Sequence, residues 1–469
     1  MMTVHKSAVR AAARTAPRFR DDTSGNVAII FALVGVVLML AIGAAVDVGR
    51  WLHARDQTIA AVDAAVLAGG RALQTSSGDK SAAIAAAKKY YDENVTSRLS
   101  VIDDTVTFAV ASNGMGMTAN GSAYIKTPFL QFAAVDKLPL INTSETDFSK
   151  SEIFIGGKGS EETIEIALML DVTGSMEGSP LKSLKDALIG AKQDCSEKDS
   201  NALICILFYS GGAKDNVRVS VVPFSEDIRL PSASLNTARG TGLAASKTLG
   251  TGNNKGTYYL TPCVVERKGN DKYTEAAPAS GRYVMAHYGT STACTLPSSG
   301  QLMPLTNDKT ALLSKIKNLT AAGGTAGHLG TAWAWYTLSP NWNTLWPSAN
   351  RAAAHGTAGL KKYAILMTDG EYNTEYDTNG VKVGSKGASS AVNGTSTAQA
   401  IKLCESMKAG EKITVYTVGF GSGINSTAKD MLTKCATTPD MYYDAKNEEE
   451  LVQAYQDIAL KMSSLYLSK

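Results

Sequence analysis

Five oxygen-bearing side chains stand at positions where they could hold a metal ion. They are Asp171, Thr173 and Ser175 in the segment DVTGS, Thr325 after a pair of glycines, and Asp369 in MTDG. Two carboxylates and three hydroxyls with room for water form an all-oxygen donor set, which suits a hard divalent cation in octahedral geometry. We therefore expect Mg²⁺ here, or another divalent cation such as Mn²⁺ or Ca²⁺. Because few of these ligands are anionic, the ion would stay electrophilic toward an Asp or Glu from a protein partner.

An alternation of strands and helices, starting near residue 162, would bring these side chains together. Strands are predicted at the apolar runs TIEIALML (163–170), VRVSVVPF (217–224), YAILMTD (363–369), ITVYTVGF (413–420) and MYYDA (441–445). Helices are predicted between them, including one that starts at Ser179-Pro180 and a last one capped by Asn447. Strands apolar on both faces predict an α/β fold with a doubly wound, mostly parallel sheet. Ligands of such sheets lie beyond the carboxyl ends of the strands, where Asp171 and Asp369 fall.

The same residues resemble the metal-ion-dependent adhesion site of von Willebrand factor A-type domains. The resemblance covers about residues 160–465 of a domain predicted at 160–469, interrupted by two insertions, and its pattern is D-x-S-x-S, a threonine, and an aspartate at a strand end. Thr173 replaces the first serine and keeps its hydroxyl. The resemblance implies that Thr173 and Ser175 ligate the ion through their hydroxyls, with Thr325 nearby. It also implies that Asp171 and Asp369 act directly or through water, and that the domain binds protein without catalysis.

An uncharged run of 20 residues, Val27–Val46, predicts a transmembrane helix within residues 23–48. Residues 1–22 carry five Lys or Arg and two Asp, which accounts for the whole formal net charge of +3. The positive-inside rule places this basic tail in the cytoplasm and the chain after about residue 50 across the membrane. A cleaved secretory signal is the alternative, although the apolar run is longer than a signal core. The balanced charge of the remaining chain argues against nucleic-acid binding.

The cysteines agree with export, because all six lie beyond the predicted anchor. Six cysteines allow fifteen disulfide connectivities, and some could be buried free thiols. Our expectation is nearest-neighbour pairing, which gives Cys195–Cys205, Cys263–Cys294 and Cys404–Cys435. No C-x-x-C occurs and the five histidines are scattered, so we expect no Cys/His zinc site.

Residues 49–150 predict a small α+β membrane-proximal unit. An apolar stripe continues the first helix to about residue 74, and SAAIAAAKKYYDENV predicts a second helix. Residues 104–132 alternate like strands, with turn signals at Asn113-Gly114 and Asn120-Gly121.

Residues 226–306 and 374–396 are rich in Gly, Ser, Thr and Asn. Because they interrupt the sheet pattern, they are predicted to be surface or functional insertions.

The N-terminal segments SGNVAIIFALVG and AVDVGRWLHARDQTIAAVDAAVLAGGRAL are similar to TadE/TadG-type proteins of tight-adherence (Flp) pilus assembly. NVAIIF lacks the glutamate of members that are processed like pilins, which favours the TadG-like side, where an exported von Willebrand-type domain follows the anchor. The resemblance implies a single-pass protein of a bacterial inner membrane with a cytoplasmic N-terminus. The C-terminal domain would be periplasmic or at the cell surface, where it would bind protein partners in pilus assembly or adhesion.

Two other functions remain open, a metal-dependent phosphohydrolase on the same fold and a structural secretion component with a non-functional metal site. We do not expect an enzyme. Phosphatases with an Asp nucleophile on a similar sheet need a second Asp at the position of Thr173 and a Lys that contacts the phosphate, and neither is evident here. The sequence also has no G-x-S-x-G motif of a serine hydrolase and no phosphate-loop motif. Glu371 is expected to be a solvated loop carboxylate, His328 to face solvent or core, and Trp333 and Trp335 to pack in the interior.

Overall fold

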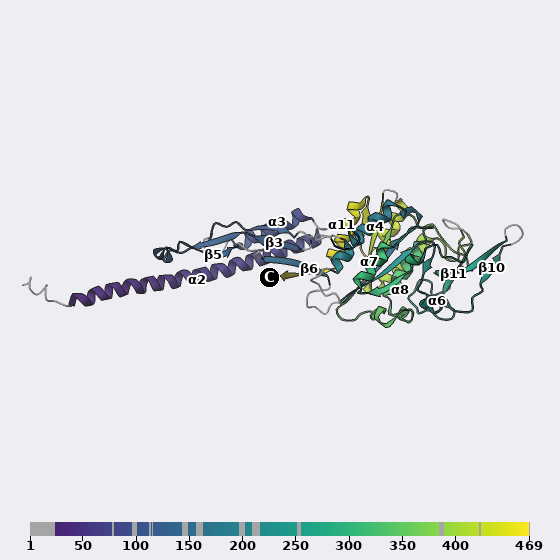
Figure 1. Ribbon diagram of the computed structural model, residues 1–469, viewed down its shortest axis with the longest axis horizontal. Helices are drawn as coiled ribbons and strands as arrows, with labels where there is room; N and C mark the ends of the chain where they lie inside the picture. The colour runs from purple at the N-terminus through teal and green to yellow at the C-terminus, as the bar shows by residue number, and fades with distance from the viewer. Residues whose placement is uncertain are drawn as a thin grey trace, which may run out of the picture.

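The molecule is elongated, with a long helix at one end and an α/β region at the other (Figure 1). The computed structural model describes residues 24–76, 79–95, 101–111, 114, 116–142, 149–155, 163–196, 202–208, 216–250, 255–383, 389–421 and 424–468. The basic tail and Asn113, where one turn is predicted, lie outside the described residues.

Helix α2 (Ser24–Thr75) runs for 52 residues without a break, since no proline interrupts its sequence. By length and composition it can cross a membrane, and its apolar side chains near the N-terminus are exposed, Phe31 by 78%. Further along, α2 packs against α3 (Lys80–Val95). The two helices approach closely at Gly69, where a Cβ would lie 2.9 Å from the Cβ of Ala87. The predicted continuation of the first helix and the predicted second helix are both confirmed.

Two small antiparallel sheets accompany α2 (Figure 1). One has the order β1-β4-β5 and the other the order β17-β6-β3-β2. Their strands are β1 (Val101–Ile102), β2 (Thr107–Val110), β3 (Gly116–Asn120), β4 (Ser122–Lys126), β5 (Lys137–Asn142), β6 (Ser149–Ile155) and β17 (Ser463–Ser468). The predicted turn at Asn120-Gly121 joins β3 to β4, so it carries the chain from one sheet to the other rather than closing a hairpin. Strand β17 pairs with β6, so the end of the α/β region returns to the sheet beside α2.

A six-stranded sheet forms the centre of the α/β region, in the order β13-β8-β7-β14-β15-β16. Its strands are β7 (Thr163–Asp171), β8 (Val217–Phe224), β13 (Met303–Thr306), β14 (Leu360–Thr368), β15 (Thr414–Phe420) and β16 (Tyr442–Ala445). All neighbouring pairs are parallel except β13 with β8, which places one antiparallel strand at the edge. The predicted mostly parallel sheet is therefore confirmed.

Helices cover both faces of this sheet, as predicted for a doubly wound fold. In β7, Ile166 and Leu168 face one hydrophobic cluster while Ala167 and Met169 face the other. One face carries α4 (Ser179–Ile189), α5 (Leu203–Leu207), α7 (Lys309–Lys317) and α11 (Glu448–Lys461); the other carries α8 (Gly327–Leu338), α9 (Ser396–Lys408) and α10 (Ser426–Cys435). Short 3-10 helices are η1 (Leu130–Ala133), η2 (Gly174–Met176), η4 (Ser298–Gly300), η5 (Pro340–Leu345), η6 (Ser348–Asn350), η7 (Ala409–Glu411) and η8 (Pro439–Met441). Helix α8 is buried all round, so Trp333 and Trp335 both pack in the interior as predicted.

The two predicted insertions form one unit. The first contains β9 (Ile228–Arg229), α6 (Ser232–Arg239), β10 (Ser246–Leu249), β11 (Gly256–Arg267) and β12 (Val284–Gly289), and these four strands make a separate antiparallel sheet. The predicted end of this insertion at residue 306 is too late, because β13 already pairs with β8 in the central sheet. The hairpin of β10 and β11 projects at the end of the molecule remote from the N-terminal part of α2 (Figure 1). The second insertion packs on this sheet, since the N–H of Tyr288 donates to the carbonyl of Gly380 at 3.0 Å.

All three predicted disulfides are present, Cys195–Cys205, Cys263–Cys294 and Cys404–Cys435. The last of these joins α9 to α10 on one face of the sheet.

Removing Cys404–Cys435 is expected to cost more stability than removing Cys195–Cys205, because the first closes a loop of 31 residues and the second a loop of 10. The chain-entropy relation gives about 4 and about 3 kcal/mol for the two bonds. Paired Cys→Ala variants of the detergent-solubilised protein would be unfolded in urea and followed by tryptophan fluorescence. A larger loss for the Cys195/Cys205 variant would contradict this ordering.

Candidate metal centre

Two neighbouring parallel strands place the two predicted site aspartates at the same edge of the sheet. Asp171 is the last residue of β7, and Asp369 directly follows the last residue of β14. The strands pair in register up to Met169 and Leu366, so their carboxyl ends lie side by side. After β7 the chain turns into η2, which carries Ser175.

Hydrogen bonds join four of the five predicted site residues. The hydroxyl of Thr173 donates to Asp171 Oδ1 at 2.6 Å, and its backbone N–H donates to the same oxygen at 3.0 Å. The hydroxyl of Ser175 donates to Asp369 Oδ1 at 2.9 Å. The two hydroxyl oxygens, Thr173 Oγ1 and Ser175 Oγ, lie 3.0 Å apart. The structure thus brings together two carboxylates and two hydroxyls from two strand ends.

The fifth residue, Thr325, lies in a loop that packs against the DVTGS segment. The N–H of Gly174 donates to the carbonyl of Gly323 at 2.9 Å, which holds the two loops together. The backbone N–H of Thr325 donates to Asn373 Oδ1 at 3.0 Å, and the side chain is 5% exposed. No hydrogen bond joins its hydroxyl to the four side chains above, all of which are described. Thr325 is therefore placed near the set through its loop rather than by direct contact.

Sequence reasoning missed Thr368, whose hydroxyl donates to Asp171 Oδ2 at 2.6 Å. Both oxygens of Asp171 are therefore held by donors of the chain. Glu226, which follows β8, accepts from the N–H of Gly324 at 3.0 Å and pairs with Lys382, so it fixes the loop of Thr325. The only sequence signal for Thr368 is its place as a hydroxyl residue at the end of an apolar strand, directly before Asp369.

Burial and like charge make the two carboxylates costly to ionise. Asp171 is fully buried, and burial, followed by the charge of Asp369, raises its pKa to about 7 against the opposing hydrogen bonds of Thr173 and Thr368. Burial also raises the pKa of Asp369, while the hydrogen bond from Ser175 opposes that shift. Among the described residues, neither carboxylate forms an ion pair with Lys, Arg or His.

The donor set suits a divalent cation. The hydroxyl hydrogens of Thr173 and Ser175 are directed at carboxylates, which leaves oxygen lone pairs free for an ion. A cation near them would also offset the repulsion between Asp171 and Asp369. Asp171 and Thr173 are buried, Asp369 is half-buried and Ser175 is exposed, so the set opens to solvent on the Ser175 side.

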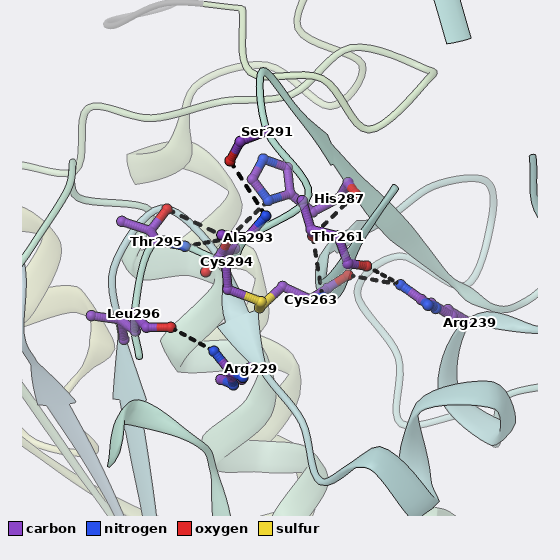
Figure 2. The surroundings of a disulfide bond; sticks show 11 residues. Arg229, Arg239, Thr261, Cys263, His287, Ser291, Ala293, Cys294, Thr295 and Leu296 are labelled. Carbon is purple, nitrogen blue, oxygen red and sulfur yellow. Dashed lines mark hydrogen bonds and ion pairs between the residues drawn. A yellow bond between two sulfur atoms is a disulfide. The ribbon is translucent and has the colours of Figure 1, made fainter. Parts of the chain in front are cut away.

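A second group of potential ligands, Asp227, Cys263 and Cys294, does not offer a metal site. Figure 2 shows that the two sulfurs are joined in a disulfide, so neither is available as a thiolate. Asp227 is bound by His287 Nδ1 at 2.8 Å and by the N–H of Thr295 at 3.2 Å. These contacts fasten the segment after β12 to the insertion sheet.

Two residues considered beside the site have structural partners. His328 belongs to the core, with its Nε2 2.9 Å from Glu266 Oε2 and its Nδ1 2.6 Å from the hydroxyl of Ser396. Glu371 is half-buried and accepts from the Nδ2 of Asn425 at 2.9 Å. The side chains that donate to the two aspartates of the set are those of Thr173, Ser175 and Thr368.

The N-terminal segment matches a known family. Residues 25–72 match the model described as "Putative Flp pilus-assembly TadE/G-like", and these residues lie within α2. The resemblance predicted for this segment is thereby confirmed, and the chain carries a TadE/G-like N-terminal helix. No curated protein matches the chain significantly.

Several solved structures of low identity also match. The vWF domain of the type V pili tip protein Mfa5 from Porphyromonas gingivalis is 13% identical with a TM-score of 0.34, and the match covers 64% of this chain and 95% of that one. The open conformation of the pilus adhesin SpaC from Lactobacillus rhamnosus GG is 13% identical with a TM-score of 0.34, over 76% and 41% of the two chains. Proximal thread matrix protein 1 from the mussel byssus, with a zinc-occupied MIDAS motif, is 12% identical with a TM-score of 0.30, over 66% and 48%. The matches therefore cover less than half the length of each of the last two proteins.

Proposed function

We propose that this protein is a membrane-anchored, exported protein of the von Willebrand factor A type that binds a divalent cation. The ligands would be Asp171, Thr173, Ser175, Thr325 and Asp369, and the ion would be Mg²⁺, Mn²⁺ or Ca²⁺. The observation that carries this proposal is the hydrogen-bonded set of two carboxylates and two hydroxyls at the ends of β7 and β14. When bound, the ion supplies an electrophilic position that a carboxylate can occupy.

The exposure of the set supports protein binding rather than catalysis. Because Ser175 is exposed while Asp171 and Thr173 are buried, an ion held here would face solvent on one side only. An Asp or Glu of a protein partner could complete its ligand shell from that side. The TadE/G-like helix supports a partner from the machinery of pilus assembly or surface adhesion.

The topology is part of the same proposal. Residues 1–22 would be cytoplasmic, residues 23–48 would span a bacterial inner membrane, and the unit of residues 49–150 and the domain of residues 160–469 would be periplasmic or at the cell surface. The net charge of residues 1–22 and the three disulfides support this orientation. Protease added to spheroplasts is expected to degrade the chain beyond residue 49, whereas full protection in intact spheroplasts would contradict the orientation.

Calorimetric titration of the full chain in lipid nanodiscs tests the metal site. Mg²⁺, Mn²⁺ and Ca²⁺ would be added separately, and at least one is expected to bind one ion per chain. Glu371→Gln is the control, because this loop carboxylate lies outside the set and accepts from Asn425. Failure of all three ions to bind the wild type would overturn the proposal. Hydrolysis of a generic phosphate ester that is lost in Asp171→Ala would instead indicate a phosphohydrolase.

A further inference from the structure

The loop between β4 and β5, residues 127–136, exposes a cluster of apolar side chains. We call this segment the η1 loop, because it contains the 3-10 helix η1. Phe129 is 43% exposed, Phe132 75% and Val135 37%. From residue 127 to residue 135 the sequence TPFLQFAAV carries no charge. Two exposed phenylalanines and a valine on one short loop are unusual on a surface that faces only water.

The η1 loop is fixed beside the apolar part of α2. Asp47 Oδ2 accepts from the backbone N–H groups of Phe129 and Leu130, at 2.7 and 2.8 Å. The ring of Phe129 covers Gly43, where a Cβ would lie only 2.6 Å from its Cδ1. Gly43 belongs to the uncharged run that ends at Val46. The hairpin of β4 and β5 therefore extends along α2 toward the N-terminal end of the helix, as far as this run (Figure 1).

Many backbone groups of the η1 loop are hydrogen-bonded within the protein. Besides the two bonds to Asp47, internal bonds run from the N–H of Thr127 to Asp136 O, of Gln131 to Thr127 O, of Phe132 to Phe129 O, of Ala134 to Gln131 O, and of Val135 to Leu130 O. The side-chain amide of Gln131 donates to the carbonyl of Pro128 at 2.7 Å. Each backbone group bonded in this way no longer needs water, which lowers the cost of moving the loop into the interface region of a bilayer.

Groups typical of a membrane interface lie at the base of the loop. Lys126 and Lys137 face each other across β4 and β5, and both are exposed. Lys137 Nζ lies 2.6 Å from Asp103 Oδ2 and 4.3 Å from the centre of the Tyr124 ring. On the helix, Trp51 Nε1 donates to the carbonyl of Pro139 at 2.8 Å. Tryptophan, tyrosine and lysine are the residues that gather at the level of lipid headgroups.

We propose that the η1 loop is a second membrane-inserted element, which buries Phe129, Phe132 and Val135 in the leaflet around Gly43. This inference rests on the proposed membrane anchor. The loop and α2 would enter the bilayer together, because Asp47 joins them at the end of the apolar run. The loop would thus set the depth and rotation of the helix, and with them the distance of the metal-binding domain from the membrane.

A lipid-borne quencher distinguishes the bilayer from a protein as the occupant of this surface. All six native cysteines are in disulfides, so Phe132→Cys introduces a single thiol for an NBD fluorophore. The labelled full chain would be placed in phosphatidylcholine and phosphatidylglycerol nanodiscs that contain nitroxides on the acyl chains. Ile42→Cys reports the anchor itself, since Ile42 is 65% exposed on α2. Tyr259→Cys is the control far from the membrane, since Tyr259 is 41% exposed on β11.

We expect acyl-chain nitroxides to quench the label at position 132 to a similar degree as at 42, and at least about two-fold more than at 259. Quenching at 42 but not at 132 would overturn the inserted loop while leaving the anchor intact, and a lack of quenching at 42 would overturn the anchor. A blue-shifted label at 132 without quenching would indicate a protein partner or second copy and would also overturn the proposal. In the background of Gly43→Leu, which displaces Phe129, quenching at 132 should fall, whereas Gly49→Leu, with nothing within 4 Å of its added Cβ, should change nothing.

Discussion

Replacing Asp369 with asparagine is expected to lower the affinity for a divalent cation by about 10–100-fold or more. Changes of residues that only hydrogen-bond to a metal ligand already have effects of this size. The variant keeps the size of the side chain and an oxygen that can accept from Ser175, so the local structure should persist. It removes one of the two negative charges that would hold the ion. It also removes the like charge that raises the pKa of Asp171, so the protein without metal should be no less stable than the wild type.

Stability measurements separate this effect from a structural defect. A ligand that binds only the folded state raises the free energy of unfolding by about 2.7 kcal/mol at a free concentration of 100 times its Kd. The wild type and Glu371→Gln should show this gain in urea unfolding with Mg²⁺ or the best-binding ion, and Asp369→Asn should show almost none. Equal gains in all three proteins would contradict the assignment of Asp369.

Asp171→Asn is expected to behave differently, and the difference tests the geometry of the set. Asp171 accepts two hydrogen bonds from Thr173 and one from Thr368, and it is fully buried. An amide at this position would turn its NH₂ group toward a donor, which leaves a buried polar group unsatisfied at a cost of about 1–3 kcal/mol. This variant should therefore lose stability even without metal, as well as lose ion binding.

The strands and two site aspartates were predictable because their signals are local. Each of the five apolar runs predicted as a strand after residue 162 is a strand in the structure, and Asp171 and Asp369 mark the point where two of these runs end. The role of Thr368 was not predictable in the same way. Its contact with Asp171 spans 197 positions in the sequence and depends on β14 lying directly beside β7. Residue types suggest ligands, but only strand order shows which side chains hold those ligands in place.

The remaining differences also arise from long-range pairing. The composition of residues 226–306 resembles that of loops, yet β11 extends over twelve residues, Gly256–Arg267, because β9, β10 and β12 pair with it and a disulfide fastens Cys263. Strand β17 was not predicted, since it exists only by pairing with β6, more than three hundred residues earlier in the printed sequence. The η1 loop was not recognised from the sequence because its place beside the apolar part of α2 depends on the hydrogen bonds to Asp47.

Replacing Glu165 with alanine is expected to destabilise the protein by about 3–5 kcal/mol, the range for breaking a buried ion pair. Glu165 in β7 is fully buried between Arg218 in β8 and Lys362 in β14, which are its direct partners in the two ladders. Its Oε2 lies 3.0 Å from Lys362 Nζ, and its Oε1 is paired with Arg218 and accepts from the N–H of Ala353. Lys362 is 4% exposed, so the variant would leave a buried cation without its counterion.

Urea unfolding of three variants tests the origin of this loss. Asp430→Ala removes an exposed ion pair with Lys434 and should cost no more than about 1 kcal/mol. A combined variant, Glu165→Leu with Arg218→Met and Lys362→Met, should recover most of the stability, because apolar groups of similar size can replace a buried charge cluster. A loss in Glu165→Ala no larger than that in Asp430→Ala would contradict the prediction. Glu165 stands near the amino end of β7 and Asp171 at its carboxyl end, so the ion affinity of the folded variant should stay at the wild-type value.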